Sequence, residues 1–198
     1  NKAIEIYNGT GSPVDLLNYK LMLYSNGSST GTSISLTTTT KTINHGETFV
    51  IANSSSNATI LDLADLTSGA LQHNGDDAIA LAKDGVNIDV FGVIGEDPGS
   101  AWTWAGGSTE NKTLVRKSTV SNPTTTWDSS EWNVHPNDTF TYLGTHEVDY
   151  LFVGQHEIVV VVDGVSTPIF VSNGSSVPTP TKEGFTFKAV ITTKPEVE

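Results

Sequence analysis

The chain has 198 residues, of which 22 are acidic and 10 basic, and its formal net charge is −12 at pH 7. This excess of negative charge repels a phosphate backbone and argues against autonomous binding to nucleic acid. The absence of cysteine excludes disulfides, thiolate nucleophiles and cysteine-bound metals. No apolar run reaches the roughly 18 residues of a membrane span, so we expect no membrane insertion.

Short alternating runs of apolar and polar residues dominate the first half of the chain and predict strands. Ile4 and Ile6 fall on one face of an opening strand at residues 4–7. Further strands are predicted at residues 21–24, at 33–42 as a polar edge strand, and at 49–52 as a buried strand. Apolar residues at near-helical spacing predict one helix, at residues 60–66.

A β-hairpin at residues 78–91 is the clearest local signal. Its apolar residues alternate on either side of Asp84 and Gly85, which supply a tight turn. Beyond it follow a long loop at residues 92–112 and short strands at 114–117 and 140–143. Many short strands separated by turns predict an all-β fold, an antiparallel sandwich, and not a βαβ arrangement.

From residue 150 the pattern changes to longer apolar runs. A β-branched run at residues 158–162, a turn at Asp163 and Gly164, and a strand at 169–171 predict a second hairpin. Alternation at residues 185–191 predicts a last strand. The predicted organisation is a first domain at residues 1–146, a linker at 147–149 and a smaller β unit at 150–198.

An ordered set of segments in the first domain resembles the bacterial lamin tail domain. The matching segments are residues 4–8, 13–16, 75–81, 88–92, Trp102, 113–117, 131–132 and 142–146. The resemblance implies an immunoglobulin-like β-sandwich without catalytic residues. In bacteria such modules are attached to secreted or surface proteins, often beside extracellular nuclease or phosphoesterase domains.

The family usually has a further strand ahead of the segment at residues 4–8, and this chain starts too late to contain it. The backbone of residues 3–7 would then be unpaired along one side, which is a template for another strand. We expect that edge to be covered, either by residues 158–162 or by the same edge of a second copy in a homodimer.

The second unit resembles the Listeria-Bacteroides repeat, also known as the B-repeat of internalins. The matching segments are residues 159–164, Gly174, 177–178 and 180–187. The resemblance implies a small β-grasp-like module of bacterial surface proteins. This chain has Ala189 and Val190 where the family usually has Gly-Trp, so a core tryptophan is missing.

Asp76 and Asp77 are adjacent carboxylates that follow a glycine and could ligate a hard cation such as Ca²⁺. The alternative is a turn into the strand that follows, with one carboxylate accepting backbone N–H bonds. The residues lack the alternating Asp and Asn spacing of a calcium loop, which favours the turn.

Arg116 is the one arginine of an acidic chain and lies in a predicted strand. Its planar guanidinium suits a structural ion pair with a partly buried carboxylate. The resemblance makes Asp76, Asp77 and Glu131 the candidate partners. Capture of an anionic ligand is the alternative, although a single cation binds anions weakly.

Trp102 and Trp104 are two residues apart in the long loop and would share one face of an extended backbone. They could stack on a sugar ring, which would make the chain a carbohydrate-binding module. The alternative is that one of them closes the end of the sandwich while the other is partly exposed, as large aromatic residues commonly do in β domains.

The sequence contains no His-Glu-x-x-His motif and no phosphate loop. The hypothesis is therefore a non-enzymatic module, without a required cofactor, of a larger secreted or cell-surface protein. It would serve adhesion, spacing or targeting of a linked domain, with a protein or glycan as its partner. The alternatives are an accessory part of an extracellular nuclease or phosphoesterase, and a carbohydrate-binding module.

Overall fold

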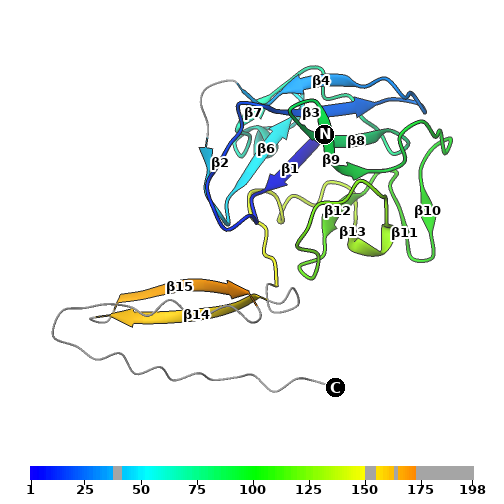
Figure 1. Cartoon of the computed structure of the whole chain (residues 1–198). Coiled ribbons are helices and arrows are strands. Elements are labelled where there is room, and N and C mark those ends of the chain that lie inside the picture. The colour runs from blue at the N-terminus through cyan, green and yellow to red at the C-terminus, as the bar shows by residue number, and fades with distance from the viewer. Residues whose placement is uncertain (38–41, 150–154, 163–164, 173–198) are drawn as a thin grey trace. The chain divides into compact units, whose positions relative to one another are not determined.

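The computed structural model describes residues 1–37, 42–149, 155–162 and 165–172 (Figure 1). Of the last two ranges, it describes the backbone alone. The chain divides into two compact units, Asn1–Asp149 and Tyr150–Glu198. Whether residues 1–146 fold alone stays a prediction for limited proteolysis.

Two sheets form the main part of the first unit (Figure 1). One contains β1 (Ala3–Tyr7), β6 (Thr48–Ala52) and β7 (Leu66–Thr67), in the order β1-β6-β7. The other has the order β4-β3-β8-β9, with β4 (Thr32–Ser35), β3 (Tyr19–Tyr24), β8 (Ala78–Lys83) and β9 (Val86–Phe91). All pairs are antiparallel except β6 with β7.

Smaller elements complete the first unit. Three antiparallel pairs join β2 (Val14–Asp15) to β5 (Thr42–Ile43), β10 (Thr103–Trp104) to β11 (Gly107–Ser108), and β12 (Thr113–Arg116) to β13 (Trp132–His135). The helical elements are α1 (Ala58–Leu61) and the 3₁₀ turn η1 (Ser129–Glu131). None of the described helices has the length and apolar character of a membrane-spanning segment.

The core lies between the two sheets because alternate residues of their strands face each other. Its buried members from these strands are Leu21, Leu23, Ile34, Phe49, Ile51 and Ile79. Ile4 and Ile6 of β1 pack against it, as their spacing predicts. Burial of each such side chain contributes about 1.5–3 kcal/mol, which makes this layer the main source of stability.

Several predicted strands are confirmed, namely residues 4–7, 21–24 and the buried strand at 49–52. In the hairpin of β8 and β9, Asp84 (φ 50°) and Gly85 (φ 81°) both adopt the left-handed conformation of a tight two-residue turn. The predicted edge strand at 33–42 is shorter: β4 ends at Ser35 and β5 begins at Thr42.

The helix predicted at residues 60–66 is wrong in its bounds. The observed helix spans Ala58–Leu61, and Leu66 already lies in β7. Asp65 donates its backbone N–H to the Val50 carbonyl (2.9 Å), while its carboxylate accepts the Val50 N–H (2.9 Å). These bonds to β6 draw the chain into a parallel strand pair, which the apolar spacing could not reveal.

The strand predicted at residues 140–143 is a turn, in which Leu143 donates its N–H to the Phe140 carbonyl (3.0 Å). Gly144 follows with φ 94°, a conformation that glycine adopts without steric cost. β12 pairs with β13, a strand that the local sequence pattern did not predict. Similarly, the long loop contains the short pair β10 and β11.

The second unit contains the hairpin of β14 (Gln155–Val162) and β15 (Val165–Ser172), paired antiparallel from Gln155↔Ser172 to Val162↔Val165. The hairpin predicted around Asp163 and Gly164 is confirmed in its strands. The strand predicted at residues 185–191 lies outside the described residues.

Candidate functional site

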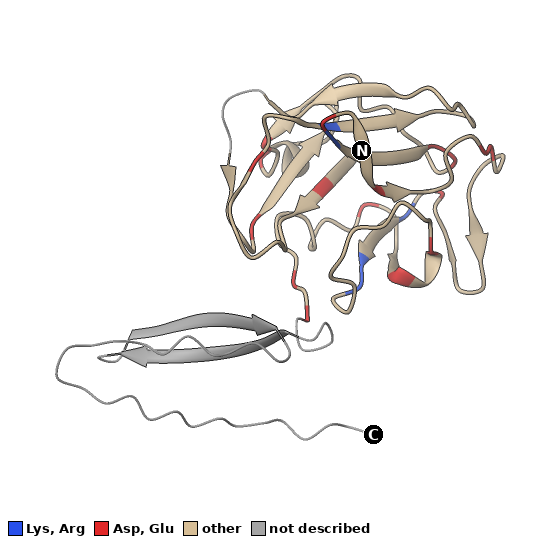
Figure 2. Cartoon of the chain, in the orientation of Figure 1, with Lys and Arg blue, Asp and Glu red and all other residues tan. Residues whose placement is uncertain are grey.

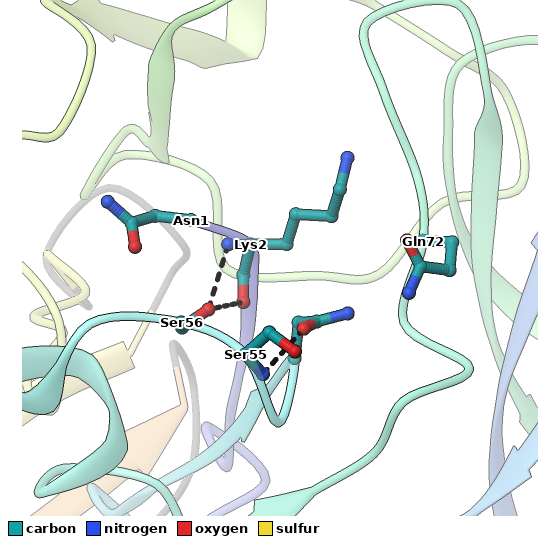
Figure 3. A pocket seen from close by; sticks show the side chains of 6 residues that line it. Asn1, Lys2, Ser55, Ser56 and Gln72 are labelled. Atoms are coloured by element: carbon teal, nitrogen blue, oxygen red, sulfur yellow. Dashed lines mark hydrogen bonds between the residues drawn. The ribbon is translucent and has the colours of Figure 1, made fainter.

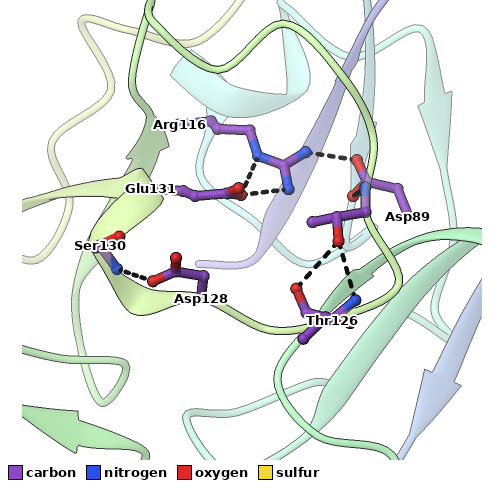
Figure 4. A network of polar contacts seen from close by, with 7 residues as sticks. Asp89, Arg116, Thr126, Asp128, Ser130 and Glu131 are labelled. Carbon is purple, nitrogen blue, oxygen red and sulfur yellow. Dashed lines mark hydrogen bonds and ion pairs between the residues drawn. The ribbon is translucent and has the colours of Figure 1, made fainter.

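Arg116 forms an ion-pair network with two carboxylates at the side of the sandwich (Figure 4). Its Nη1 donates to Asp89 Oδ2 at 2.6 Å. Its Nε and Nη2 both donate to Glu131 Oε2, at 3.2 and 2.9 Å. The Arg116 side chain is 17 % exposed, so solvent screens these interactions less than it would screen a surface pair.

Three elements bring this network together. Arg116 ends β12 and is in register with Trp132 of β13, so Glu131 is placed directly beside it. The guanidinium carbon also lies 5.2 Å from the centre of the Trp132 ring, within cation–π distance. Asp89 comes from β9, and its second oxygen accepts the Thr124 N–H (3.1 Å). The network thus joins β9 to the pair of β12 and β13.

The pKa of Arg116 lies above its ordinary value. Burial acts to lower it, but hydrogen bonds and charges of Asp89 and Glu131 outweigh this effect. The structure therefore pairs Arg116 with one of the three predicted carboxylates, Glu131, and places Asp76 and Asp77 elsewhere.

Asp89 was not among the predicted partners of Arg116, because no local pattern shows that β9 lies beside β12. The register between β8 and β9 shifts at Leu81 and Ala82, so Asn87 pairs with Ala82 while Asp89 pairs with Leu81. The shift puts Asn87 and Asp89 on opposite faces, whereas regular alternation would put them on the same face. The only signal in the sequence was the hairpin itself, which does not reveal a bulge.

Asp77 uses both carboxylate oxygens to hold a turn. Oδ1 accepts the Asn26 N–H (2.9 Å), and Oδ2 accepts the Asn74 N–H (3.1 Å), as the turn alternative requires. The neighbouring Asp76 is 6 % exposed, and its Oδ1 has no hydrogen-bond partner. Within the described ranges, no three His, Cys, Asp or Glu residues form a group that could hold a metal ion. Cation binding at this turn stays a prediction.

The four tryptophans form one cluster centred on Trp127. Ring centres lie 6.5 Å away for Trp102, 6.3 Å for Trp104 and 6.0 Å for Trp132. Phe91 of β9 completes the cluster, with its ring centre 4.6 Å from that of Trp127. From the sequence, Trp102 and Trp104 were considered as a pair, because nothing local shows that all four tryptophans converge.

Trp102 and Trp104 are both half-buried. Trp102 packs on the outer face of the β4-β3-β8-β9 sheet, and a Cβ on Gly92 would lie 2.7 Å from its ring. Trp104 lies so close over Gly107 that a Cβ there would be 2.4 Å from its ring. Both rings therefore have structural contacts on at least one side. Sugar binding by this pair stays a prediction.

A polar depression of about 300 Å³ lies at the start of β1 (Figure 3). Ser56 Oγ bonds both the backbone N–H and the carbonyl of Lys2, at 3.1 and 3.2 Å. Asn53 accepts the Ser55 N–H (2.8 Å) and donates to the Leu71 carbonyl (2.9 Å). These groups tie the start of β1 to the segment that leads into α1, so their hydrogen bonds stabilise the fold.

The outer side-chain face of β1 is covered by the segment at residues 140–146. Gly144 donates its N–H to the Glu5 carboxylate, and the His146 ring packs edge-on against Tyr7 at 5.0 Å. Burial raises the pKa of Glu5 to about 7, while the Gly144 N–H acts in the opposite direction and the charge of Asp65 adds to the rise.

Comparison with known families gives a match for the first part of the chain. Residues 1–95 match the family model of the Lamin Tail Domain. This lamin tail segment contains both sheets, from β1 to β9. Together with the antiparallel sheets, the match establishes an immunoglobulin-like β-sandwich. No curated protein and no solved structure matches the chain.

The lamin tail match ends before the tryptophan loop and before Arg116. The resemblance of the segments at residues 102–146 therefore goes beyond the matched part. The resemblance of residues 150–198 to a surface-protein repeat stays a prediction, as nothing here tests it.

Proposed function

We propose that this chain is a non-catalytic interaction module of a larger secreted or cell-surface bacterial protein. In that protein it would serve the adhesion, spacing or targeting of a linked domain. The lamin tail match over residues 1–95 supports this proposal, because that family is an immunoglobulin-like domain without enzymatic activity.

The observation that carries the proposal is what the polar side chains do in the first unit. Arg116 is engaged by Asp89 and Glu131, and Asp77 by two backbone N–H groups. A catalytic group needs a partner that positions it beside an open site where a substrate can lie. Arg116, Glu131 and Asp77 are instead used to hold strands and turns together.

The test has an enzymatic and a genetic part. We expect no turnover of DNA, RNA or phosphoesters by the full chain with Mg²⁺ or Ca²⁺. A turnover signal that disappears in the Asp76→Ala or Asp77→Ala variant would contradict the proposal. The sequence of the complete parent protein decides between the alternatives: a linked nuclease or phosphoesterase domain would make this chain its accessory part, and adhesin or anchoring domains would support adhesion.

A further inference from the structure

β4 is an edge strand of its sheet, and half of its backbone N–H and C=O groups point away from the sheet. Leu36 donates its N–H to the Tyr19 carbonyl (3.2 Å), so Leu36 and, two residues earlier, Ile34 are bonded to β3. Because bonded and non-bonded pairs alternate in an antiparallel ladder, Ser33 and Ser35 direct their N–H and C=O groups outward. No other described strand pairs with this side of β4.

This edge lacks the features that usually protect an edge strand. Three of the four β4 residues are exposed, and Ile34 alone is buried. Residues 21–40 contain no charged side chain, and Figure 2 shows β4 without the blue of Lys and Arg or the red of Asp and Glu. Natural edge strands are commonly protected by lysine, proline or a bulge, and the described part of this edge has none of them.

A groove of about 470 Å³ lies beside the edge, on the outer face of the same sheet. Its lining includes Lys20, Met22, Tyr24, Gly31, Ser33 and Val86. The residues on the β4 side, Gly31 and Ser33, are small, so no tall side chain separates the groove from the free edge. Gly31 has to be small, because a Cβ there would lie 2.9 Å from the Tyr24 ring.

The groove combines an apolar part with one cation. Met22 and Val86 supply apolar surface, and Val86 is 65 % exposed. Lys20 is the one charged residue of the lining and is itself exposed. Met22 is in register with Ser33, and Lys20 with Ser35. A strand added to β4 would therefore place successive outer-face side chains in line with Met22 and then with Lys20.

We propose that β4 binds an extended segment of a partner protein as an added strand. The segment would carry a long apolar side chain beside Ser33 and an acidic side chain two residues away, beside Ser35. Such a strand lies about 10 Å from β3, two strand spacings away, and long side chains from both sides bridge that distance. Backbone bonds to Ser33 and Ser35 supply affinity, while Met22 and Lys20 select the side chains.

A second copy of this chain fits the edge less well. Paired β4 strands would offer each other only Ser33 and Ser35 on the outer face, and these side chains are too short to fill the groove. Each copy also carries a net charge of −12, which opposes association. A foreign segment can supply the long apolar side chain that Ser33 and Ser35 of a second copy lack.

This inference rests on the proposed function and names the class of partner. The test selects a phage-displayed library of random peptides on the full chain and measures the affinity of the enriched peptides by fluorescence anisotropy. We expect enriched sequences to carry a long apolar residue and Asp or Glu two positions apart. Hydrogen exchange should slow at Ser33 and Ser35 when such a peptide binds. Absence of any enriched peptide would overturn the inference.

Two proline variants identify the edge. Ser33→Pro removes an outward N–H without touching the ladder to β3, and it should weaken peptide binding by roughly tenfold or more. Ala3→Pro is the matched control: Asn53 donates to the Lys2 carbonyl (2.9 Å), so Ala3 directs its N–H away from β6. It should leave the affinity unchanged. Equal effects of both variants, or none from Ser33→Pro, would overturn the assignment to β4.

A charge exchange tests the acidic position. Lys20→Glu should weaken an acidic peptide about threefold, as expected for an exposed ion pair, and replacing the acidic residue by lysine should restore binding to this variant. If peptides bind but Ser33→Pro does not weaken them, the assignment of the binding site to β4 is wrong, while the chain is still an interaction module. If the chain hydrolyses a substrate, the proposed non-catalytic function is wrong, and the peptide site on β4 is unaffected. Dimers that dissociate on Ser33→Pro, seen by sedimentation, would make a second copy the occupant.

Discussion

β1 and β4 each end one sheet of the same sandwich, yet their surroundings differ. Both strands direct alternate backbone groups away from their sheet. All five residues of β1 are half-buried, since Ile4 and Ile6 pack on the core while Gly144 and His146 lie against Glu5 and Tyr7 on the other face. Three of the four β4 residues are exposed. A strand's position in a sheet therefore does not decide whether it is available to a partner. Segments distant in sequence decide it.

The expectation that the backbone edge of β1 is covered stays a prediction, because the contacts described above are made to the side chains of Glu5 and Tyr7 and not to the outward N–H and C=O groups. The contacts on β1 come from Gly144 and His146, which precede the second unit. In the described residues, β14 pairs with β15. A second copy paired along β1 stays a prediction.

The largest effect is expected from Arg116→Ala, which should destabilise the first unit by about 3 kcal/mol because Asp89 and Glu131 are left unpaired in a partly buried site. The network stabilises the pair of β12 and β13, and the chain continues from β13 into the segment that contacts β1. Arg116→Lys is the control, since it keeps the charge without the two-sided guanidinium, and its loss should be intermediate. Urea denaturation measures both, and a value for Arg116→Ala within error of the wild type would remove the structural role.

Gly144→Ala should destabilise by about 1 kcal/mol, because alanine is strained at φ 94°. Gly95→Ala is matched: its φ is 87°, and a Cβ there would meet no atom within 4 Å. The two variants should lose similar stability, but only Gly144→Ala should speed hydrogen exchange in β1. Equal exchange in both would mean that Gly144 does not hold the cover on β1.

The free energy of unfolding should depend on pH through the protonation of Glu5. Its pKa is about 7 in the folded chain against 4.5 as the ordinary value, so the unfolded chain releases this proton at lower pH. The stability therefore falls as pH rises from 4.5 to 7. Glu5→Gln should flatten this part of the curve from denaturation at several pH values. His73, whose pKa burial lowers to about 4, gives the opposite slope between pH 6.5 and 4 and remains in both proteins.

The smallest effect is expected from Ser33→Pro on the stability of the free chain. Its N–H points outward from β4, so we expect a change within about 0.5 kcal/mol. Ile34→Pro is the control on the same strand, because it removes a ladder bond to β3 and should cost about 3 kcal/mol. Thermal denaturation compares the two. Similar losses would show that the hydrogen-bond alternation assigned to β4 is wrong.

The sequence by itself determined the features whose causes are local. The hairpin of β8 and β9 follows from alternation around Asp84 and Gly85, two residues that adopt left-handed backbone at low cost. The core faces of β1 and β3 follow from a period of two, since a strand with one buried face has to alternate. An all-β sandwich could be predicted because these signals recur along the chain.

Only the tertiary structure decided which distant residues meet. The Trp127 cluster, the pairing of Arg116 with Asp89, and the contact of Gly144 with Glu5 join segments tens of residues apart. Local patterns do not contain this information, because a bulge changes the face of the residues that follow it in the strand, and no local signal shows which distant segments pack together. The exposed β4 and the covered β1 differ for the same reason: coverage is a property of the packed chain, and strand patterns record only which residues alternate.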